Sequence, residues 1–132
     1  MKLLRLSGRK NCDYVMRKGR LWKGRHFFVR WLPGAPRSPL VNPSVRAFYV
    51  GTVASTKLDK SAVKRNRMRR RCREALRISL KNLVTGHWSL VTGAEKLSTI
   101  QLLILPRSSS LSVPFTELTE DIQHFLMTLS HG

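Results

Sequence analysis

The sequence predicts a single α+β domain over residues 1–132, with the order helix, strands, helix, strand, helix. Two observations support this expectation. The chain has 132 residues, 42% of them hydrophobic, which is enough to bury a core without disulfides. Runs typical of strands alternate along the chain with apolar residues at helical spacing, and we find no internal repeat or low-complexity tract.

The N-terminal elements follow from local pattern. Residues 11–18 are predicted to form a short helix, because Cys12, Val15 and Met16 recur at helical spacing before Gly19. Residues 26–32 are aromatic and β-branched, which is typical of a strand.

A second strand, or part of a meander, is expected over residues 45–54, where side chains alternate. The intervening residues 33–43 contain four prolines and are expected to form a loop or hairpin connection.

A longer helix is predicted from a cap at Asp59 or Ser61 to about Leu80. Its apolar stripe is expected at Met68, Cys72, Ala75, Leu76 and Ser79.

The C-terminal part is expected to contain a buried strand at 99–105, a serine-rich loop at 106–114 and an amphipathic helix at 115–129. Residues 88–92 could form a further short strand between two glycines.

The positive charge lies in one half of the chain. The formal net charge is +18, and residues 1–73 hold 21 of the 25 Lys and Arg residues but only two acids. Such a surface repels itself in isolation and indicates a polyanionic partner.

We expect a cytoplasmic protein with reduced thiols, because two cysteines make no disulfide framework and no N-terminal apolar segment precedes the charges. The basic segment has no broad apolar face for insertion, so no membrane partner is expected.

The most basic segment is Lys60 to Arg73, with eight Lys or Arg residues in 14 and no acid. On a helix, Lys64, Arg67 and Arg71 would line one flank of the apolar stripe, and Arg70, Arg73 and Arg77 the other. The planar guanidinium group matches phosphate oxygens, so this segment is predicted to bind a phosphate-bearing polyanion with strong salt dependence. The alternatives are a solvated helix face or a localisation signal.

Asn66 lies between two arginines, and its pattern leaves two interpretations open. It is either a polar filler or an amide that binds phosphate, a base edge or the backbone at a helix start.

No catalytic residue and no metal site are predicted in the chain itself. The four histidines show no close pairing, no paired-carboxylate motif occurs, and Cys12 and Cys72 fit no zinc spacing.

The stretch Ala62 to Arg77 reads AVKRNRMRRRCREALR, and it resembles the signature of the protein subunit of bacterial ribonuclease P. The resemblance extends upstream through Arg5-Leu6, Val15 and Lys18-Gly19, and downstream to about Phe125. It covers roughly nine tenths of the chain, and residues 81–98 match least.

The resemblance implies an α/β sandwich of about four strands and three helices, with a left-handed βαβ crossover, of the ribosomal protein S5 domain 2-like type. It also implies a catalytic RNA partner that removes the 5′ leader from precursor tRNA and requires Mg²⁺. The protein itself would hold no cofactor and need no obligate protein partner. The implied contacts to the RNA subunit are Lys64, Arg65, Asn66, Arg67, Arg69, Arg70 and Arg73.

The resemblance further implies a cleft for the single-stranded leader, lined by Cys12, Met16, Phe28, Arg30, Thr52, Ala54 and Lys57. Family members usually carry aromatic residues where this chain has Cys12 and Met16, so leader affinity would depend more on Arg30 and Lys57. Cys12 and Met16 could instead be core residues. The turn between Ala54 and Arg65 is also slightly longer than in many members.

Two other functions would produce similar charge. A structural RNA-binding protein of ribosomal type would bind ribosomal RNA, and an autonomous nuclease would cleave without an RNA subunit.

Overall fold

The computed structural model describes residues 2–37, 46–85 and 99–131. The predicted strand at 88–92 lies outside the described residues, as does most of the proline-rich connection. The elements are, in chain order, β1 (Lys2–Arg5), α1 (Arg9–Lys18), β2 (Arg20–Lys23), β3 (Phe27–Pro33), β4 (Ala47–Thr52), α2 (Ala62–Thr85), β5 (Ile100–Pro106), the 3₁₀ turn η2 (Ser108–Leu111) and α4 (Phe115–His131).

The strands form one mixed sheet in the order β1-β4-β5-β3-β2. The β2–β3 and β3–β5 pairs are antiparallel, whereas β4 runs parallel to both β1 and β5. The parallel pair β4 and β5 is joined through α2, which is the βαβ connection expected from the resemblance. The sheet has five strands rather than about four.

Two of the five strands, β1 and β2, were not predicted from the local pattern, and they lie at the two edges of the sheet. Each has four residues, and each carries a cation at both ends of an apolar pair, Lys2-Leu3-Leu4-Arg5 and Arg20-Leu21-Trp22-Lys23. Short, charged strands are typical of sheet edges. These strands show no clear strand pattern in the sequence, because they form through pairing with β4 and β3.

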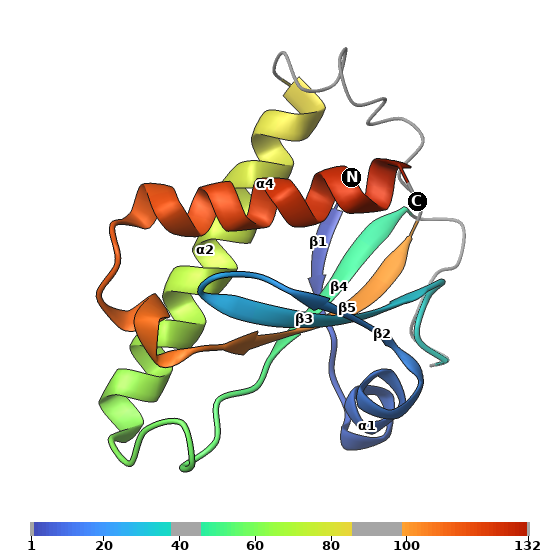
Figure 1. The fold of residues 1–132 in the computed structure, drawn as a ribbon. Helices are drawn as coiled ribbons and strands as arrows, with labels where there is room; N and C mark the ends of the chain where they lie inside the picture. Colours follow the sequence, from blue (N-terminus) through green and yellow to red (C-terminus); the bar gives the residue numbers. More distant parts are fainter. Residues whose placement is uncertain (1, 38–45, 86–98, 132) are drawn as a thin grey trace.

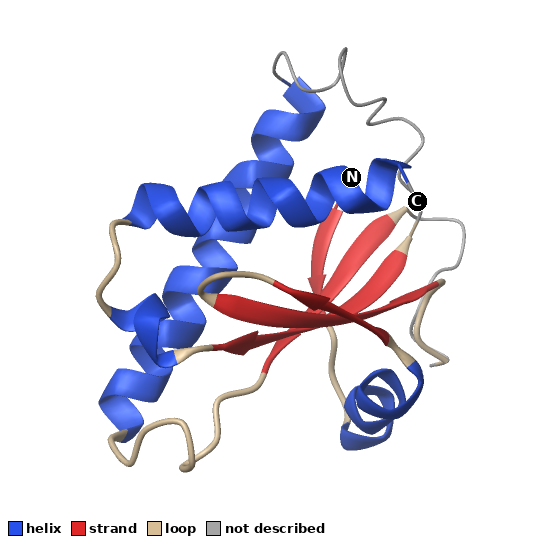
Figure 2. Ribbon diagram, in the orientation of Figure 1, coloured by secondary structure: helices blue, strands red, loops and turns tan. Residues whose placement is uncertain are grey.

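Helices cover both faces of the sheet, with α2 and α4 crossing on one face and α1 on the other (Figure 1; Figure 2). The larger core lies beneath α2 and α4 and is built around Phe27, Phe48, Leu76 and Phe125, all fully buried. A smaller core beneath α1 contains Leu6, Val15, Ala47, Tyr49 and Leu103. Alternation along β4 therefore sends apolar side chains into both layers.

The predicted stripe on α2 is confirmed, because its five members, Met68, Cys72, Ala75, Leu76 and Ser79, are all buried. The start is confirmed at Ser61, whose hydroxyl accepts a hydrogen bond from the Lys64 amide at 3.3 Å. Asp59 does not cap the helix directly. Its carboxylate accepts a hydrogen bond from the Ser61 amide at 2.8 Å and so holds the capping residue in place. The helix continues to Thr85, beyond the predicted end at about Leu80.

Helix α1 begins two residues earlier than predicted, at Arg9 after Gly8. Gly8 has φ of 90°, a conformation that glycine adopts without steric cost, and no side chain caps this helix start. The earlier start therefore had no side-chain signal in the sequence. Of the three predicted apolar residues, Val15 is buried, Cys12 is half-buried and Met16 is exposed.

The segment predicted as a serine-rich loop contains the short 3₁₀ turn η2. Its Ser110 amide and hydroxyl both donate to the Arg107 carbonyl, at 3.0 and 2.7 Å. The turn packs against α2 and leads into α4.

Candidate nucleic-acid interface

Four cations at intervals of three residues wind around the exposed side of α2, from the flank of Lys64 to the opposite flank at Arg73. They are Lys64, Arg67, Arg70 and Arg73, and we refer to them as the basic stripe. All four are exposed, and none of their side chains forms a hydrogen bond or ion pair with a described residue. The stripe extends over about 13 Å of the helix. Four unpaired cations at this spacing form a surface suited to a chain of phosphates.

The other predicted α2 arginines are bound within the chain. Arg65 donates to the carbonyls of Asp59 and Lys60 at 2.8 and 3.1 Å, which braces the loop before the helix. Arg69 donates to the Ala54 carbonyl at 3.0 Å. These two side chains therefore fix the backbone beside the basic stripe. Each guanidinium group has five N–H donors, so some remain for binding.

Asn66 is exposed, and its side-chain oxygen accepts a hydrogen bond from Arg69 at 2.6 Å. The amide therefore orients a neighbouring guanidinium group. Asn66 is thus part of the basic surface and holds one of its arginines in place.

Arg71 lies on the expected flank of α2 with Lys64 and Arg67, but its side chain is bound within the fold. Its guanidinium group donates to the Ser110 carbonyl at 2.7 Å and to the Val113 carbonyl. Both acceptors lie about 40 residues further along the chain, so periodicity on the helix could not reveal them. Arg71 ties α2 to the segment between β5 and α4.

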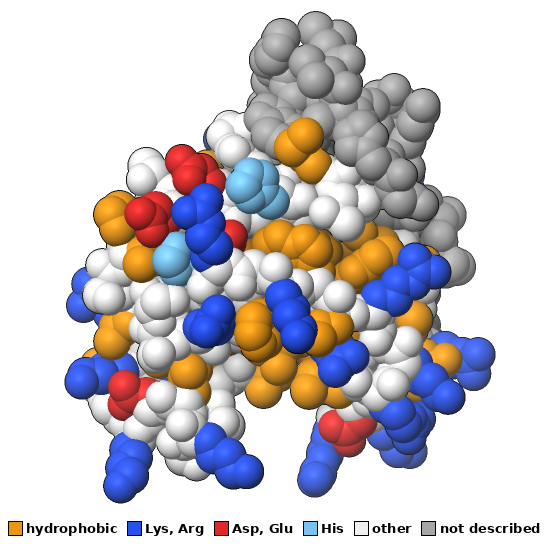
Figure 3. All heavy atoms as spheres, viewed as in Figure 1, with side chains coloured by type: hydrophobic (Ala, Val, Ile, Leu, Met, Phe, Trp, Pro, Cys, Tyr) orange, Lys and Arg blue, Asp and Glu red, His pale blue; other side chains and the backbone are white. Residues whose placement is uncertain are grey.

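The basic stripe ends at a hollow of about 340 Å³ between the chain before α1 and the end of β4. Arg73 lines this hollow together with Cys12 of α1 and Thr52 of β4, and we call it the β4 hollow. Two further cations on its wall, Arg5 and Arg9, were not predicted as leader contacts. Figure 3 shows Lys and Arg side chains around α1 and the start of α2, with a recess between these two projections.

The five remaining predicted leader residues do not line the β4 hollow. Phe28 and Arg30 alternate with the buried Phe27 and Val29 along β3, so their side chains lie on the sheet face that carries α1. Arg30 donates to the Gly19 carbonyl at 3.4 Å, beside the end of α1.

The other three do not join the β4 hollow. Met16 is 39% exposed on α1, so it is not a core residue. Ala54 is buried, and only its carbonyl contributes, to Arg69. Lys57 lies in the loop before α2, in a separate shallow hollow. Residue spacing alone could not separate these locations.

Arg107 is a cation near the predicted cleft that the sequence pattern did not reveal. Its guanidinium carbon lies 5.3 Å from the centre of the Phe28 ring, within cation–π range. Its amide donates to the His26 carbonyl at 3.0 Å, which fixes its position after β5. A single arginine after a strand has no periodic signal in the sequence.

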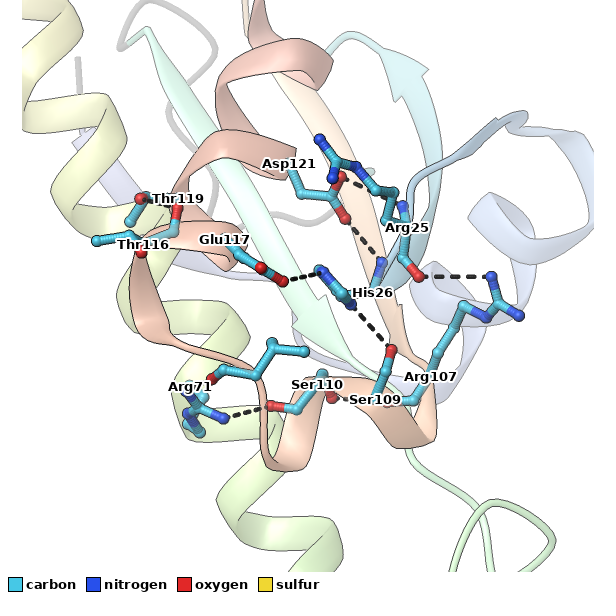
Figure 4. A network of polar contacts seen from close by, with 11 residues as sticks. Arg25, His26, Arg71, Arg107, Ser109, Ser110, Thr116, Glu117, Thr119 and Asp121 are labelled. Carbon is cyan, nitrogen blue, oxygen red and sulfur yellow. Dashed lines mark hydrogen bonds and ion pairs between the residues drawn. The ribbon is translucent and has the colours of Figure 1, made fainter.

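The β2–β3 hairpin is fixed to α4 by a polar network (Figure 4). The carboxylate of Asp121, which is 3% exposed, accepts hydrogen bonds from the amides of Arg25 and His26 at 3.2 and 2.8 Å. The His26 ring contacts Ser109 and Glu117, each at 3.0 Å. A carboxylate only accepts, so His26 Nε2 carries the proton that is donated to Glu117. The pairing of His26 with an acid was not expected from the sequence.

The metal-binding and thiol chemistry of the described residues is limited. They contain no group of three or more His, Cys, Asp and Glu side chains that could hold a metal ion. Burial raises the pKa of the Cys72 thiol to about 12, and it also raises the pKa of Cys12. Neither environment favours a thiolate nucleophile. No described helix is long and apolar enough to span a membrane.

An α+β fold with a long basic helix beside a cation-lined hollow defines a nucleic-acid-binding class of protein. The profile of the Ribonuclease P family matches residues 1–130, and the chain therefore belongs to this family.

The chain is also similar to individual family members. It is 42% identical over 76 residues to the ribonuclease P protein component of Thermus thermophilus. This alignment covers 58% of this chain and 39% of that protein. It is 23% identical over 129 residues to the Rickettsia canadensis component. That alignment covers 96% of this chain and 98% of the relative. The chain spans about two fifths of the length of the Thermus relatives it matches.

Solved structures show the same fold. The RNase P protein from Thermotoga maritima aligns with a TM-score of 0.64 at 17% identity, covering 94% of this chain and 96% of that one. The RNase P protein from Staphylococcus aureus aligns with a TM-score of 0.62 at 18% identity, covering 94% and 93%. The predicted α+β class and its relation to this fold are confirmed.

Proposed function

We propose that the chain is a noncatalytic subunit of ribonuclease P, which assists a catalytic RNA in removing the 5′ leader from precursor tRNA. The observation that carries the proposal is the continuity between the basic stripe and the β4 hollow. Arg73 belongs to both, so one surface can contact the RNA subunit and the leader at once.

The basic stripe would bind the RNA subunit through phosphate contacts. Its four cations are exposed and without partners among the described residues, so binding need not break internal ion pairs. Each contact releases counterions from the RNA, which makes affinity fall with salt. Arg65, Asn66 and Arg69 would support this surface by fixing the loop and the guanidinium positions.

The leader would enter the β4 hollow and continue across the sheet face under α1. Arg5, Arg9 and Arg73 offer phosphate contacts, and Cys12 offers only a small apolar surface. Phe28 beside Arg107, with Arg30 nearby, would provide a stacking and cationic site further along β3. Thr52 would contact the leader inside the hollow, whereas Met16, Ala54 and Lys57 remain proposed leader contacts at positions outside it.

The RNA subunit would supply the chemistry and bind the Mg²⁺ that cleavage requires. The protein would act in the cytoplasm without an obligate protein partner. Its contribution would be to neutralise phosphate repulsion between leader and RNA subunit, which lowers the Mg²⁺ concentration that cleavage needs.

The test measures leader cleavage by the RNA subunit from the same genome over a range of Mg²⁺, with and without the chain. We expect the chain to shift the Mg²⁺ dependence to lower concentration, and to cleave nothing by itself. The variant Arg67→Ala with Arg70→Ala should lose most of the shift. Cleavage that is unchanged by the wild-type chain at every Mg²⁺ concentration would contradict the proposal.

A further inference from the structure

A second hollow, of about 490 Å³, lies on the other side of α1, between that helix, the end of β3 and the start of β5. It shares no lining residue with the β4 hollow, to which α1 contributes Arg9 and Cys12. We call it the Tyr14 groove. Its volume is within the range of small-ligand sites. The residues that matter for its chemistry are Lys10, Tyr14, Leu32, Pro33, Arg37 and Gln101.

Gln101 is the polar residue at the base of this groove. It is 4% exposed, and it pairs with Tyr49 and Leu32 on the two neighbouring strands. Its side-chain amide forms no hydrogen bond with any described residue, although it lines the groove. The Gln101 amide is not enclosed, because the Ser79 hydroxyl is the one fully buried side-chain N or O atom that lacks a hydrogen-bond partner in the described part of the chain. The amide can therefore reach a ligand in the groove, as a donor and as an acceptor.

Tyr14 supplies an aromatic wall, since it is 39% exposed on α1. The Arg17 guanidinium carbon lies 6.0 Å from the ring centre. Lys10 and Arg37 are exposed cations on the lining, and no carboxylate lines the groove. The groove thus combines a stacking surface, an unpaired amide and two cations, which match the base, the base edge and the phosphates of a nucleotide.

We propose that the Tyr14 groove binds one unpaired nucleotide of RNA. The base stacks on Tyr14 and its edge forms hydrogen bonds with the Gln101 amide, while Lys10 and Arg37 contact the flanking phosphates. Positive charge on the lining favours RNA over an apolar peptide. The inference extends the proposed RNA-binding function to a second, separate site and to base selectivity.

The first experiment measures binding of the full chain to fluorescein-labelled octaribonucleotides of A, C or U. We expect Tyr14→Ala to weaken binding of the preferred oligonucleotide about 5- to 100-fold, whereas Tyr14→Phe stays within about twofold. Gln101→Met keeps the side-chain length but lacks the amide, so it should bring the three affinities to within about twofold of each other. Equal affinities for wild type and Tyr14→Ala would overturn the proposal.

Arg67→Ala is the matched contrast, because it lies on the basic stripe and touches neither hollow. It should weaken all three oligonucleotides alike and leave their ranking unchanged. A glutamate octapeptide serves as competitor. If it displaces RNA in a Tyr14-dependent way as well as unlabelled RNA does, an acidic peptide is the ligand and the proposal is wrong. Circular dichroism melting of each variant separates lost binding from lost folding.

The second experiment identifies the source of the nucleotide in the assembled holoenzyme. The photoreactive base 4-thiouridine is placed either in the leader of precursor tRNA or in the RNA subunit, and adducts are mapped by mass spectrometry. An adduct on Tyr14 from one RNA assigns the groove to that RNA. Absence of a Tyr14 adduct from both overturns the inference, while leader cleavage in the same samples reports on the proposed function separately.

Discussion

Replacing Arg71 with alanine should destabilise the fold without weakening the RNA-binding surface. The side chain makes two hydrogen bonds from a charged donor, to the carbonyls of Ser110 and Val113. Such bonds contribute roughly 1.5–3 kcal/mol each, and part of this is recovered when water enters the space that the side chain leaves. We therefore expect a loss of about 2–4 kcal/mol in the free energy of unfolding, out of a total of roughly 5–15 kcal/mol.

Urea denaturation followed by circular dichroism measures this loss. With a slope near 2 kcal/mol per molar urea, the midpoint should fall by about 1–2 M. The urea midpoint of Arg71→Lys should lie between those of the wild type and Arg71→Ala, because an ammonium group cannot bind both carbonyls in the fork geometry of a guanidinium group. The control is Arg67→Ala, an exposed residue on the same helix, which should shift stability by less than about 0.5 kcal/mol. Equal midpoints for Arg71→Ala and Arg67→Ala would refute this reasoning.

Three further predictions concern α2 and the thiols. Arg67→Ala should reduce the slope of log affinity against log salt by about 0.7–0.9 in binding to ribonuclease P RNA, and an unchanged slope would argue against a phosphate contact. Met68→Asp should unfold the domain, seen as loss of the cooperative melting transition, because it places a carboxylate at a fully buried position. At pH 8, Ellman's reagent should modify Cys12 slowly, since its pKa is raised, and Cys72 only after urea unfolds the chain, because burial raises the pKa of that thiol to about 12. Two thiols that react at equal rates in the native chain would contradict this account.

The sequence predicted the elements whose signal is local and periodic. The Met68–Cys72 stripe follows from helical spacing, and Ser61 follows from the preference for hydroxyls at a helix start. The strand over 99–105 was recognisable as a continuous apolar run, and it corresponds to β5.

The edge strands, the role of Arg71 and the two hollows could not be predicted, because they depend on contacts between residues that are distant in the sequence. The edge strands β1 and β2 are too short and too charged to produce a strand pattern. Arg71 looked like one more surface arginine, because its acceptors are brought to it only by the packing of η2 on α2. The β4 hollow and the Tyr14 groove likewise combine residues from separate elements, so spacing could not assign Arg5 to the first or Gln101 to the second.

The most direct test of the central claim is to sequence the RNA that copurifies with the chain from cells that express it. The account predicts strong enrichment of ribonuclease P RNA with the wild-type chain, and loss of that enrichment with Arg67→Ala combined with Arg70→Ala. Enrichment of ribosomal RNA instead, or equal recovery of ribonuclease P RNA with both proteins, would contradict the claim that the basic stripe of α2 binds the RNA subunit.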